Sequence, residues 1–298
     1  MPITRRGFIS KSTAYLTAMS GFAGYAFGIE PRFRLNVTRY AFTPPNWTLG
    51  LKLKIAALSD IHASEPYMSM QRLSEIVTSA NALQADIIVL LGDYVVSTPG
   101  LHFLNLSPAL WAAELAKLKA PLGVFAILGN HDWWQYGFQG QLKSSGEVIQ
   151  ALKSAGAHVL HNDGVRLEHN GKPFWLLGLG DQLAYRGRFA NGARGADDLP
   201  LTLSKLTDNA PAILLAHEPD IFVDVPSRIS VTMSGHTHGG QVRLFGWSPV
   251  IPSRYGNRFS YGHIVESERH LLVTGGLGVS SIPIRIGMPP EIMLVELG

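Results

Sequence analysis

Acidic, amide and imidazole side chains gather at five places along this chain, each just after a short apolar run. In order, these places are Asp60-Ile61-His62, Gly92-Asp93, Gly129-Asn130-His131-Asp132, His217-Glu218 and Gly235-His236-Thr237-His238. Neutral imidazoles and hard oxygen ligands suit divalent cations such as Mn, Fe or Zn. Two such ions about 3.5–4 Å apart can hold both the attacking and the leaving oxygen of a phosphoryl displacement. These residue types therefore predict a site for two divalent metal ions.

The longer motifs are much more specific than the shorter ones. By chance, D-x-H is expected about 0.4 times and G-D about once in a chain of this composition. A second G-D is indeed present at Gly180-Asp181. G-H-x-H is expected roughly 0.04 times and G-N-H-D roughly 0.001 times. The prediction of a metal site therefore rests on all five motifs in their order and not on any single short motif.

Short apolar runs are the elements that must position these residues. We expect strands at 53–58, 85–91, 123–128, 174–179, 212–216, 229–233, 271–274 and 292–296. Five of the runs end directly before a motif. Open α/β sheets place ligands at the carboxyl ends of their strands, so the motif residues should meet at one edge.

Helices are expected between several of these runs. Residues 70–83 carry apolar side chains at three- and four-residue spacing. Ser107-Pro108 should cap a helix over 109–119, and Ser144 with Glu147 forms a capping box for a helix that stops at Gly156. The alternation predicts a layered α/β or α+β domain whose sheets are covered by helices.

Charge and composition limit the classes of partner. The chain has 25 Lys+Arg against 22 Asp+Glu, but three of the basic residues, Arg5, Arg6 and Lys11, lie in a leader without acidic residues. The remainder is formally neutral, so a basic groove that follows nucleic acid is not expected. The absence of cysteine excludes Cys-ligated zinc, iron–sulfur clusters and thiol nucleophiles.

The N-terminus is typical of a targeting segment. Arg5-Arg6-Gly7-Phe8-Ile9 is followed by an uncharged run over 12–29, which resembles a twin-arginine export signal. We expect a signal or anchor at 1–30, a lead-in at 31–50 and one catalytic domain at 51–298. The Tat translocon would then be a partner, and the protein would be periplasmic or extracytoplasmic. Cleavage near Ala23 or Ala26, retention as a membrane anchor and a plain basic arm are the alternatives.

The complete ordered signature resembles that of calcineurin-like metallophosphoesterases over residues 60–238. This resemblance implies two packed mixed β-sheets flanked by helices, as a four-layer αββα sandwich. It implies hydrolysis of phosphoesters by attack of a metal-bound hydroxide. One metal would be held by Asp60, His62, Asp93 and His238, and the second by Asp93, Asn130, His217 and His236. His131 would be the unliganded catalytic imidazole, with Asp132 orienting its other nitrogen.

A narrower resemblance covers the C-terminal part. Its segments are Gly239-Gly240-Gln241, Pro252-Ser253-Arg254-Tyr255-Gly256, Gly275-Gly276-Leu277-Gly278 and Pro283-Ile284-Arg285. They are similar to a bacterial subgroup of exported or membrane-associated phosphodiesterases, some of which hydrolyse UDP-2,3-diacylglucosamine in lipid A metabolism. That substrate is expected on the cytoplasmic face, which conflicts with export unless the leader acts only as an anchor.

Several substrates and roles stay open at this level. A diester or pyrophosphate of a lipid or envelope component is the first expectation, with a membrane surface as a further partner. UDP-2,3-diacylglucosamine, nucleotide diesters or nucleic acid, and a non-enzymatic metal-binding role are alternatives. The aromatic residues that follow G-N-H-D could form a substrate lip or pack inward: Trp133, Trp134 and Tyr136. Arg254 and Arg285 could bind phosphate or form structural ion pairs, and the Gly-Gly pairs could cradle phosphate or only make turns.

Overall fold

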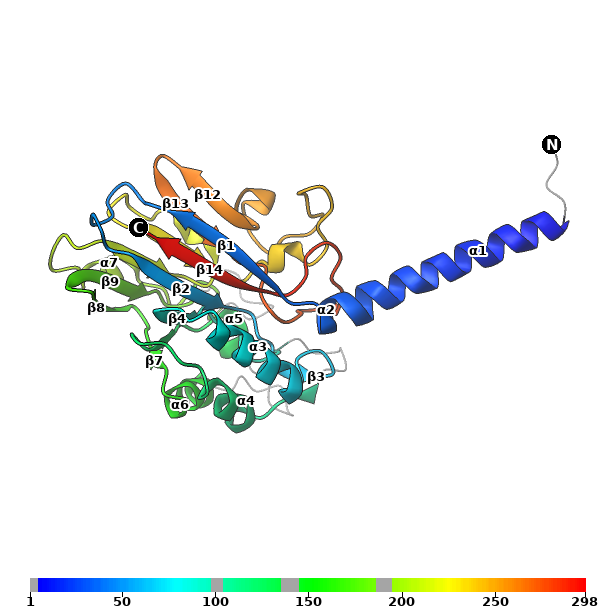
Figure 1. Ribbon diagram of the computed structural model, residues 1–298, viewed down its shortest axis with the longest axis horizontal. Helices are drawn as coiled ribbons and strands as arrows, with labels where there is room; N and C mark the ends of the chain where they lie inside the picture. The colour runs from blue at the N-terminus through cyan, green and yellow to red at the C-terminus, as the bar shows by residue number, and fades with distance from the viewer. Residues whose placement is uncertain (1–4, 98–103, 135–144, 186–194) are drawn as a thin grey trace.

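Two six-stranded sheets lie at the centre of the computed structural model, which describes residues 5–97, 104–134, 145–185 and 195–298 (Figure 1). The first has the order β1 (Asn36–Phe42), β14 (Glu291–Leu297), β2 (Leu53–Leu58), β4 (Ile87–Leu90), β6 (Val124–Ala126), β7 (His158–Val159). The second has the order β12 (Gly262–Glu266), β13 (Arg269–Val273), β11 (Val231–Ser234), β10 (Ala212–Leu215), β9 (Lys172–Gly178), β8 (Asp163–His169). A small ribbon pairs β3 (Ser64–Glu65) with β5 (Leu104–Asn105).

Both large sheets are mixed, as expected. In the first sheet β2, β4, β6 and β7 are parallel, while β14 runs antiparallel to β2. In the second sheet β9, β10, β11 and β13 are parallel, and the edge strands β8 and β12 are antiparallel to their neighbours. The parallel strands are the ones that end at the sequence motifs, so their loops emerge at a common edge.

The two sheets pack face to face because their central strands are apolar on both sides. In β2, Leu53, Ile55 and Ala57 face the core between the sheets, while Ala56 and Leu58 face the helices. This alternation follows from the two-residue period of a strand. A third apolar cluster covers the outer face of the second sheet. The result is the expected four-layer αββα sandwich.

Helices of different length cover the two outer faces. The first sheet is covered by α3 (Met70–Ala82), α4 (Pro108–Leu115) and α6 (Gly146–Ser154). The second is covered by shorter elements, α7 (Leu199–Leu203), η2 (Pro219–Val223) and η4 (Gly256–Phe259). Two further short elements, α5 (Asn130–Trp133) and η3 (His238–Gly240), carry residues of the metal motifs.

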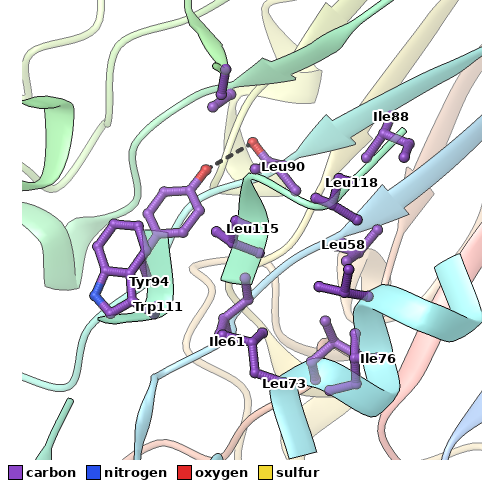
Figure 2. Close-up of a cluster of buried hydrophobic side chains, with 14 of the residues drawn as sticks. Leu58, Ile61, Leu73, Ile76, Ile88, Leu90, Tyr94, Trp111, Leu115 and Leu118 are labelled. Carbon is purple, nitrogen blue, oxygen red and sulfur yellow. Dashed lines mark hydrogen bonds between the residues drawn. The ribbon is translucent and has the colours of Figure 1, made fainter. Parts of the chain in front are cut away.

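Figure 2 shows how α3 and α4 pack against the first sheet. Leu73 and Ile76 of α3 lie close to Leu58 of β2, in the expected apolar stripe. Tyr94 stacks on Trp111 of α4 with ring centroids 5.5 Å apart. Its hydroxyl lies 3.0 Å from the carbonyl oxygen of Ile127 and 3.3 Å from that of Leu90, so it donates to the main chain of the sheet. Tyr94, which lies in the loop after β4, is thereby held by helix α4 through its ring and by the main chain of the sheet through its hydroxyl.

All eight expected strands occur, with ends that shift by a few residues, but others were missed. Three of the missed edge strands, β1, β8 and β12, consist of half-buried and exposed positions, so they lack a continuous buried apolar run. The segment 31–50, expected as a lead-in, thus contributes β1 to the first sheet.

Two details of the expected helices need correction. Helix α4 ends at Leu115, with Ala116 as its C-cap, and does not continue to residue 119. Ser145 occupies the N-cap of α6 without a side-chain hydrogen bond, and Ser144 of the expected capping box lies outside the described residues.

The N-terminal segment forms α1 (Arg5–Gly24), a π-helical turn η1 (Tyr25–Ile29) and α2 (Glu30–Phe33). Helix α1 projects away from the body of the protein (Figure 1). Within the described part of the chain, no helix combines the length and the apolar character needed to cross a membrane. Export by the twin-arginine route stays a prediction.

The packing of α3 generates a stability prediction. Leu73 is fully buried, so Leu73→Ala should leave a cavity and lower the free energy of unfolding by about 2–5 kcal/mol. Leu110 is 50% exposed on α4, and Leu110→Ala should change it by no more than about 0.5 kcal/mol. Urea denaturation of both variants checks this, and equal effects would contradict the packing described.

Candidate metal centre

The motif residues meet where strands of both sheets end. Loops after β2, β4 and β6 deliver the Asp60, Asp93 and Asn130 motifs, and loops after β10 and β11 deliver the His217 and His236 motifs. All the predicted metal ligands are buried: Asp60, His62, Asp93, Asn130, His217, His236 and His238. The structure therefore confirms that these residues gather at one edge, and the edge is shared by the two sheets.

The loops reach this edge in an unusual backbone conformation. Five predicted ligands have positive φ angles, namely Asp60, His62, Asp93, His236 and His238. Left-handed backbone costs a residue with a Cβ about 1–2 kcal/mol. Main-chain hydrogen bonds hold two of these loops together, from Asp60 N to Gly92 O and from His62 N to Asp93 O, both 3.0 Å. Such clustering of strained residues is typical of functional sites.

The first half of the site contains two imidazoles that face each other. The Nε2 atoms of His62 and His238 are 3.2 Å apart, and His238 Nε2 lies 3.4 Å from Asp60 Oδ1. His62 Nδ1 is 2.9 Å from the carbonyl oxygen of Val95 and must donate to it. The Nε2 atom of neutral His62 therefore presents a lone pair to the site.

The second half repeats this arrangement around His217 and His236. His217 Nδ1 donates to Leu91 O at 2.6 Å, and its Nε2 is buried without a hydrogen-bond partner, 3.2 Å from Asp93 Oδ2. His236 Nε2 donates to Pro252 O at 2.8 Å, which leaves its Nδ1 lone pair facing Asn130 Oδ1 at 2.9 Å. Carbonyl acceptors thus select which ring nitrogen is free in both rings.

Asp93 lies between the two halves. Its Oδ2 atom is 3.2 Å from His217 Nε2 and 3.7 Å from His62 Nε2. Burial disfavours its charged form, but the contact with His217 outweighs this: it holds the pKa of the Asp93 carboxyl well below its usual range and raises the pKa of His217 well above its own. A permanently ionised carboxylate in this position can contact cations on both sides.

The residues present fit divalent cations. A buried ring nitrogen without a hydrogen-bond partner, such as Nε2 of His217, is costly unless a proton or a metal ion satisfies it. The donor set is imidazole, carboxylate and amide oxygen, without sulfur, which suits borderline and hard ions. Three of the groups that could hold an ion combine these residues: Asp60-His62-His238, Asp93-His217-His236 and His62-Asp93-His131.

His131 lies against this cluster but has its own partners. Its Nδ1 is 2.8 Å from Ser97 Oγ and accepts from the main-chain N–H of Ser97 at 3.2 Å. Burial lowers the pKa of His131 to about 3, so the ring is neutral and its proton resides on Nε2. That nitrogen lies 3.4 Å from Ser280 Oγ at the wall of a pocket.

The expected role of Asp132 needs correction. Its carboxylate accepts main-chain N–H groups of Asp93, Tyr94 and Gly129, each at 2.9 Å, while Ser97 contacts the other nitrogen of His131. The reason is local: Asp132 is the third residue of α5, and its side chain turns back to cap that helix. Burial raises the pKa of this carboxyl to about 7. Asp132 therefore joins the Asp93 loop to the Asn130 loop.

Two pockets open directly beside the cluster. The smaller, of about 340 Å³, is lined by His131 and His238 and by the apolar side chains of Trp134, Leu183 and Val250. The larger, of about 630 Å³, is lined by polar groups that include Gln182, Glu218 and Arg254. They share Leu183, His236 and Pro252, so together they form one continuous cleft with a less polar and a more polar end.

The structure distinguishes among the residues whose roles the sequence left open. Trp134 lines the smaller pocket, whereas Trp133 packs against the helical side of the first sheet, and Tyr136 lies outside the described residues. Arg254 is exposed, 3.3 Å from Asp220, at the larger pocket. Arg285 is fully buried and cannot bind substrate, because it donates to the carbonyl groups of Gly275, Gly278 and Met288.

The Gly275-Gly276 pair is explained by close packing. Gly276 has a φ of 68°, and a Cβ at this position would lie 2.8 Å from Cβ of Asp60. The pair therefore lets the loop approach a predicted ligand, which supports the turn-forming alternative over a phosphate cradle.

Sequence reasoning missed several residues of the site. Ser97 and Ser280 contact His131, but isolated serines carry no motif. The second G-D pair was set aside as a chance match, yet Asp181 is fully buried beside His217 and Glu218. Burial, reinforced by the charge of Glu218, raises the pKa of Asp181 well above its usual range. Its position directly after β9 was the available signal, since β9 ends at the same edge.

Comparison with known proteins gives consistent matches. A family model described as calcineurin-like phosphoesterase matches residues 53–240. Phosphodiesterase YaeI of Escherichia coli is 33% identical over 303 residues, covering 99% of this chain and 99% of that protein. The metallophosphoesterase YkuE of Bacillus subtilis is 31% identical over 290 residues, covering 95% and 91%. A metallophosphoesterase of Aquifex aeolicus is 26% identical over 264 residues, covering 88% and 92%.

The contacts of Asp132 predict a defect in metal binding. Asn offers one acceptor oxygen and places an NH₂ group among backbone donors, so Asp132→Asn should weaken Mn²⁺ binding by about 10–100-fold. Isothermal titration of the metal-free protein measures this. Loss of turnover with unchanged metal affinity would instead restore the orienting role that the resemblance implied.

His131 should behave differently. Its Nδ1 is occupied by Ser97, so His131→Ala should keep the bound metal but lower turnover by about 10²–10³-fold, as expected for a hydrogen-bond donor to developing charge. Elemental analysis and steady-state kinetics on the same preparation check both points, with His158→Ala as a control outside the cluster. Loss of metal in His131→Ala would make His131 a ligand.

Proposed function

Because the chain belongs to the calcineurin-like metallophosphoesterase family, we propose that it is a metal-dependent hydrolase of phosphodiester or pyrophosphate bonds in lipid or envelope-related substrates. The observation that carries this proposal is the convergence of buried imidazole and carboxylate groups around Asp93 at the base of a two-ended cleft. Family membership supports phosphoester hydrolysis, and the cleft supports the substrate class.

The chain's own residues divide the work of the reaction. When bound, divalent cations supply Lewis acidity to a phosphoryl group and lower the pKa of coordinated water. His62, His217 and His236 hold their free nitrogen atoms toward the site because carbonyl oxygens fix their opposite nitrogens. His131 keeps its Nε2–H directed to the pocket, where this group can donate a hydrogen bond to the charge that develops on the departing oxygen.

The shape of the cleft favours a diester or pyrophosphate over a monoester. Space extends from the cluster in two directions, into pockets of about 340 and 630 Å³. A diester or pyrophosphate carries a substituent on each side of the reacting phosphorus, whereas a monoester would leave one pocket unused. The similarity to a protein named as a phosphodiesterase supports the same class.

The two ends of the cleft also differ in chemistry. Trp134, Leu183 and Val250 give the smaller pocket apolar walls, which suit a lipid substituent. Arg254 and Gln182 line the larger pocket, which suits a charged or hydroxylated substituent. UDP-2,3-diacylglucosamine is the second candidate, because it joins an acylated sugar to a nucleotide through a pyrophosphate.

A direct assay tests the proposal. The purified protein should hydrolyse bis-p-nitrophenyl phosphate faster than p-nitrophenyl phosphate with Mn²⁺, Zn²⁺, Fe²⁺ or Ni²⁺. Removal of the metal by a chelator should abolish turnover, and metal addition should restore it, because the ion supplies the Lewis acidity and the activated water that the reaction needs. Inactivity toward both esters with every metal would contradict the hydrolase proposal, and a strong monoester preference would contradict the diester class.

A further inference from the structure

Exposed apolar side chains are concentrated on one side of the protein. Among the described residues, twenty large hydrophobic side chains are exposed, and thirteen belong to two regions. Eight lie in the N-terminal segment between Tyr15 and Phe33. Five lie on or next to a hairpin over residues 242–249, namely Leu244, Phe245, Trp247, Val250 and Ile282. We call these two regions together the apolar face.

Main-chain hydrogen bonds hold the tip of the hairpin in an exposed position. Leu244 and Trp247 exchange two main-chain hydrogen bonds of 2.9 and 3.0 Å, which close a two-residue turn at Phe245-Gly246. Both turn residues have positive φ, the geometry of a type I′ turn. Phe245 is fully exposed and Trp247 is 59% exposed. A rigid turn that projects aromatic side chains into water is costly unless another surface covers them.

Helix α1 adds further exposed apolar side chains. Tyr15, Met19 and Phe22 recur at i, i+4 and i+7 and are all exposed. This spacing places the three side chains on one side of the helix. Exposed apolar side chains gathered on one side of a helix mark an area that another surface can cover.

Hydrogen bonds join the two regions and fix them beside the metal centre. The main-chain N–H of Arg285 donates to Ala26 O at 3.0 Å, and that of Met288 donates to Glu30 Oε1 at 2.8 Å. The adjoining residue Ile286 pairs with Gln241 and Arg243 at the base of the hairpin. Figure 1 shows α1 leaving the body on the side where the loops of this C-terminal region lie. Ala26 is buried, so the leader is packed against the folded protein from this residue onward.

The apolar face is contiguous with the mouth of the cleft. Val250 is 73% exposed and lines the smaller pocket together with Gln241. Gln241 in turn donates to Ile282 O at 2.8 Å. A surface that covers the hairpin would therefore lie at the entrance through which a substrate reaches His131.

The charge around this face is of one sign. Segments 5–34, 241–252 and 277–290 contain a single acidic residue, Glu30, which is buried and holds Met288 N. The same segments contain basic residues at positions 5, 6, 11, 32, 34 and 243, besides the buried Arg285. An anionic lipid surface complements this distribution. A second copy of the chain would oppose like charges.

From these observations we propose that the apolar face docks on an anionic phospholipid bilayer, with the hairpin tip inserted and α1 lying along the interface. The cleft entrance at Val250 then opens onto the bilayer surface. If the proposed phosphodiesterase function holds, this arrangement presents the smaller pocket to phosphate esters whose apolar part stays in the membrane. Docking itself requires no catalysis and is measured separately.

Vesicle flotation of the full-length chain tests the proposal. Vesicles of phosphatidylcholine with phosphatidylglycerol are compared with vesicles of phosphatidylcholine alone. The double variant Phe245→Ser/Trp247→Ser should lower partitioning onto the anionic vesicles by about tenfold or more, because two aromatic side chains no longer insert. Leu49→Ser/Val265→Ser is the matched control, since both residues are exposed but lie outside the apolar face, and it should bind as wild type.

Three results would overturn the proposal: equal binding of the hairpin and control variants, equal binding to both types of vesicle, or a dimer without vesicles that the hairpin variant dissociates. The last result would assign the face to a second copy. Hydrolysis of soluble bis-p-nitrophenyl phosphate should be the same in wild type and hairpin variant. A chain that floats with vesicles but lacks this activity would keep the docking surface and reject the proposed function.

Discussion

The control of ring nitrogens in a buried imidazole cluster is the constraint on which this structure depends. His62, His217 and His236 each turn toward the site the ring nitrogen that no carbonyl oxygen holds, and the carboxylate of Asp93 lies between His62 and His217. In an interior of low dielectric such an arrangement is unfavourable without positive charge. The sandwich supplies the opposing stability through two apolar cores, so the cluster can stay formed for a cation.

Main-chain carbonyls and a few side chains outside the ligand set control this cluster. Leu91, Val95 and Pro252 each accept from one ring nitrogen and thereby select the other for the site. Ser97 does the opposite for His131, because a backbone N–H can only donate and so leaves the proton on Nε2. Asp132 joins two of the loops that carry these groups. Neighbouring main-chain groups thus decide whether a ring nitrogen faces the site as a ligand or as a hydrogen-bond donor.

Buried Arg285 connects the metal centre to the periphery. It donates to carbonyl groups of the 275–288 loop, and Gly276 of that loop packs directly against Asp60. The same loop binds Ala26 and Glu30 of the N-terminal segment and pairs with the base of the apolar hairpin. A single loop therefore contacts the leader, the base of the hairpin and the metal centre. The proposed docking surface and the cleft are thus held in a fixed position relative to each other.

The sequence by itself determined the layered architecture, the central strands and the residues that gather at the strand ends. These features follow from local apolar periodicity and from motifs such as G-N-H-D, which are too improbable to arise by chance. Only the tertiary structure decided the edge strands β1, β8 and β12, the partner of His131 and the burial of Arg285 and Asp181. Those depend on contacts between residues far apart in the chain. A half-buried strand, a serine or an arginine has the same local pattern whichever distant group it meets.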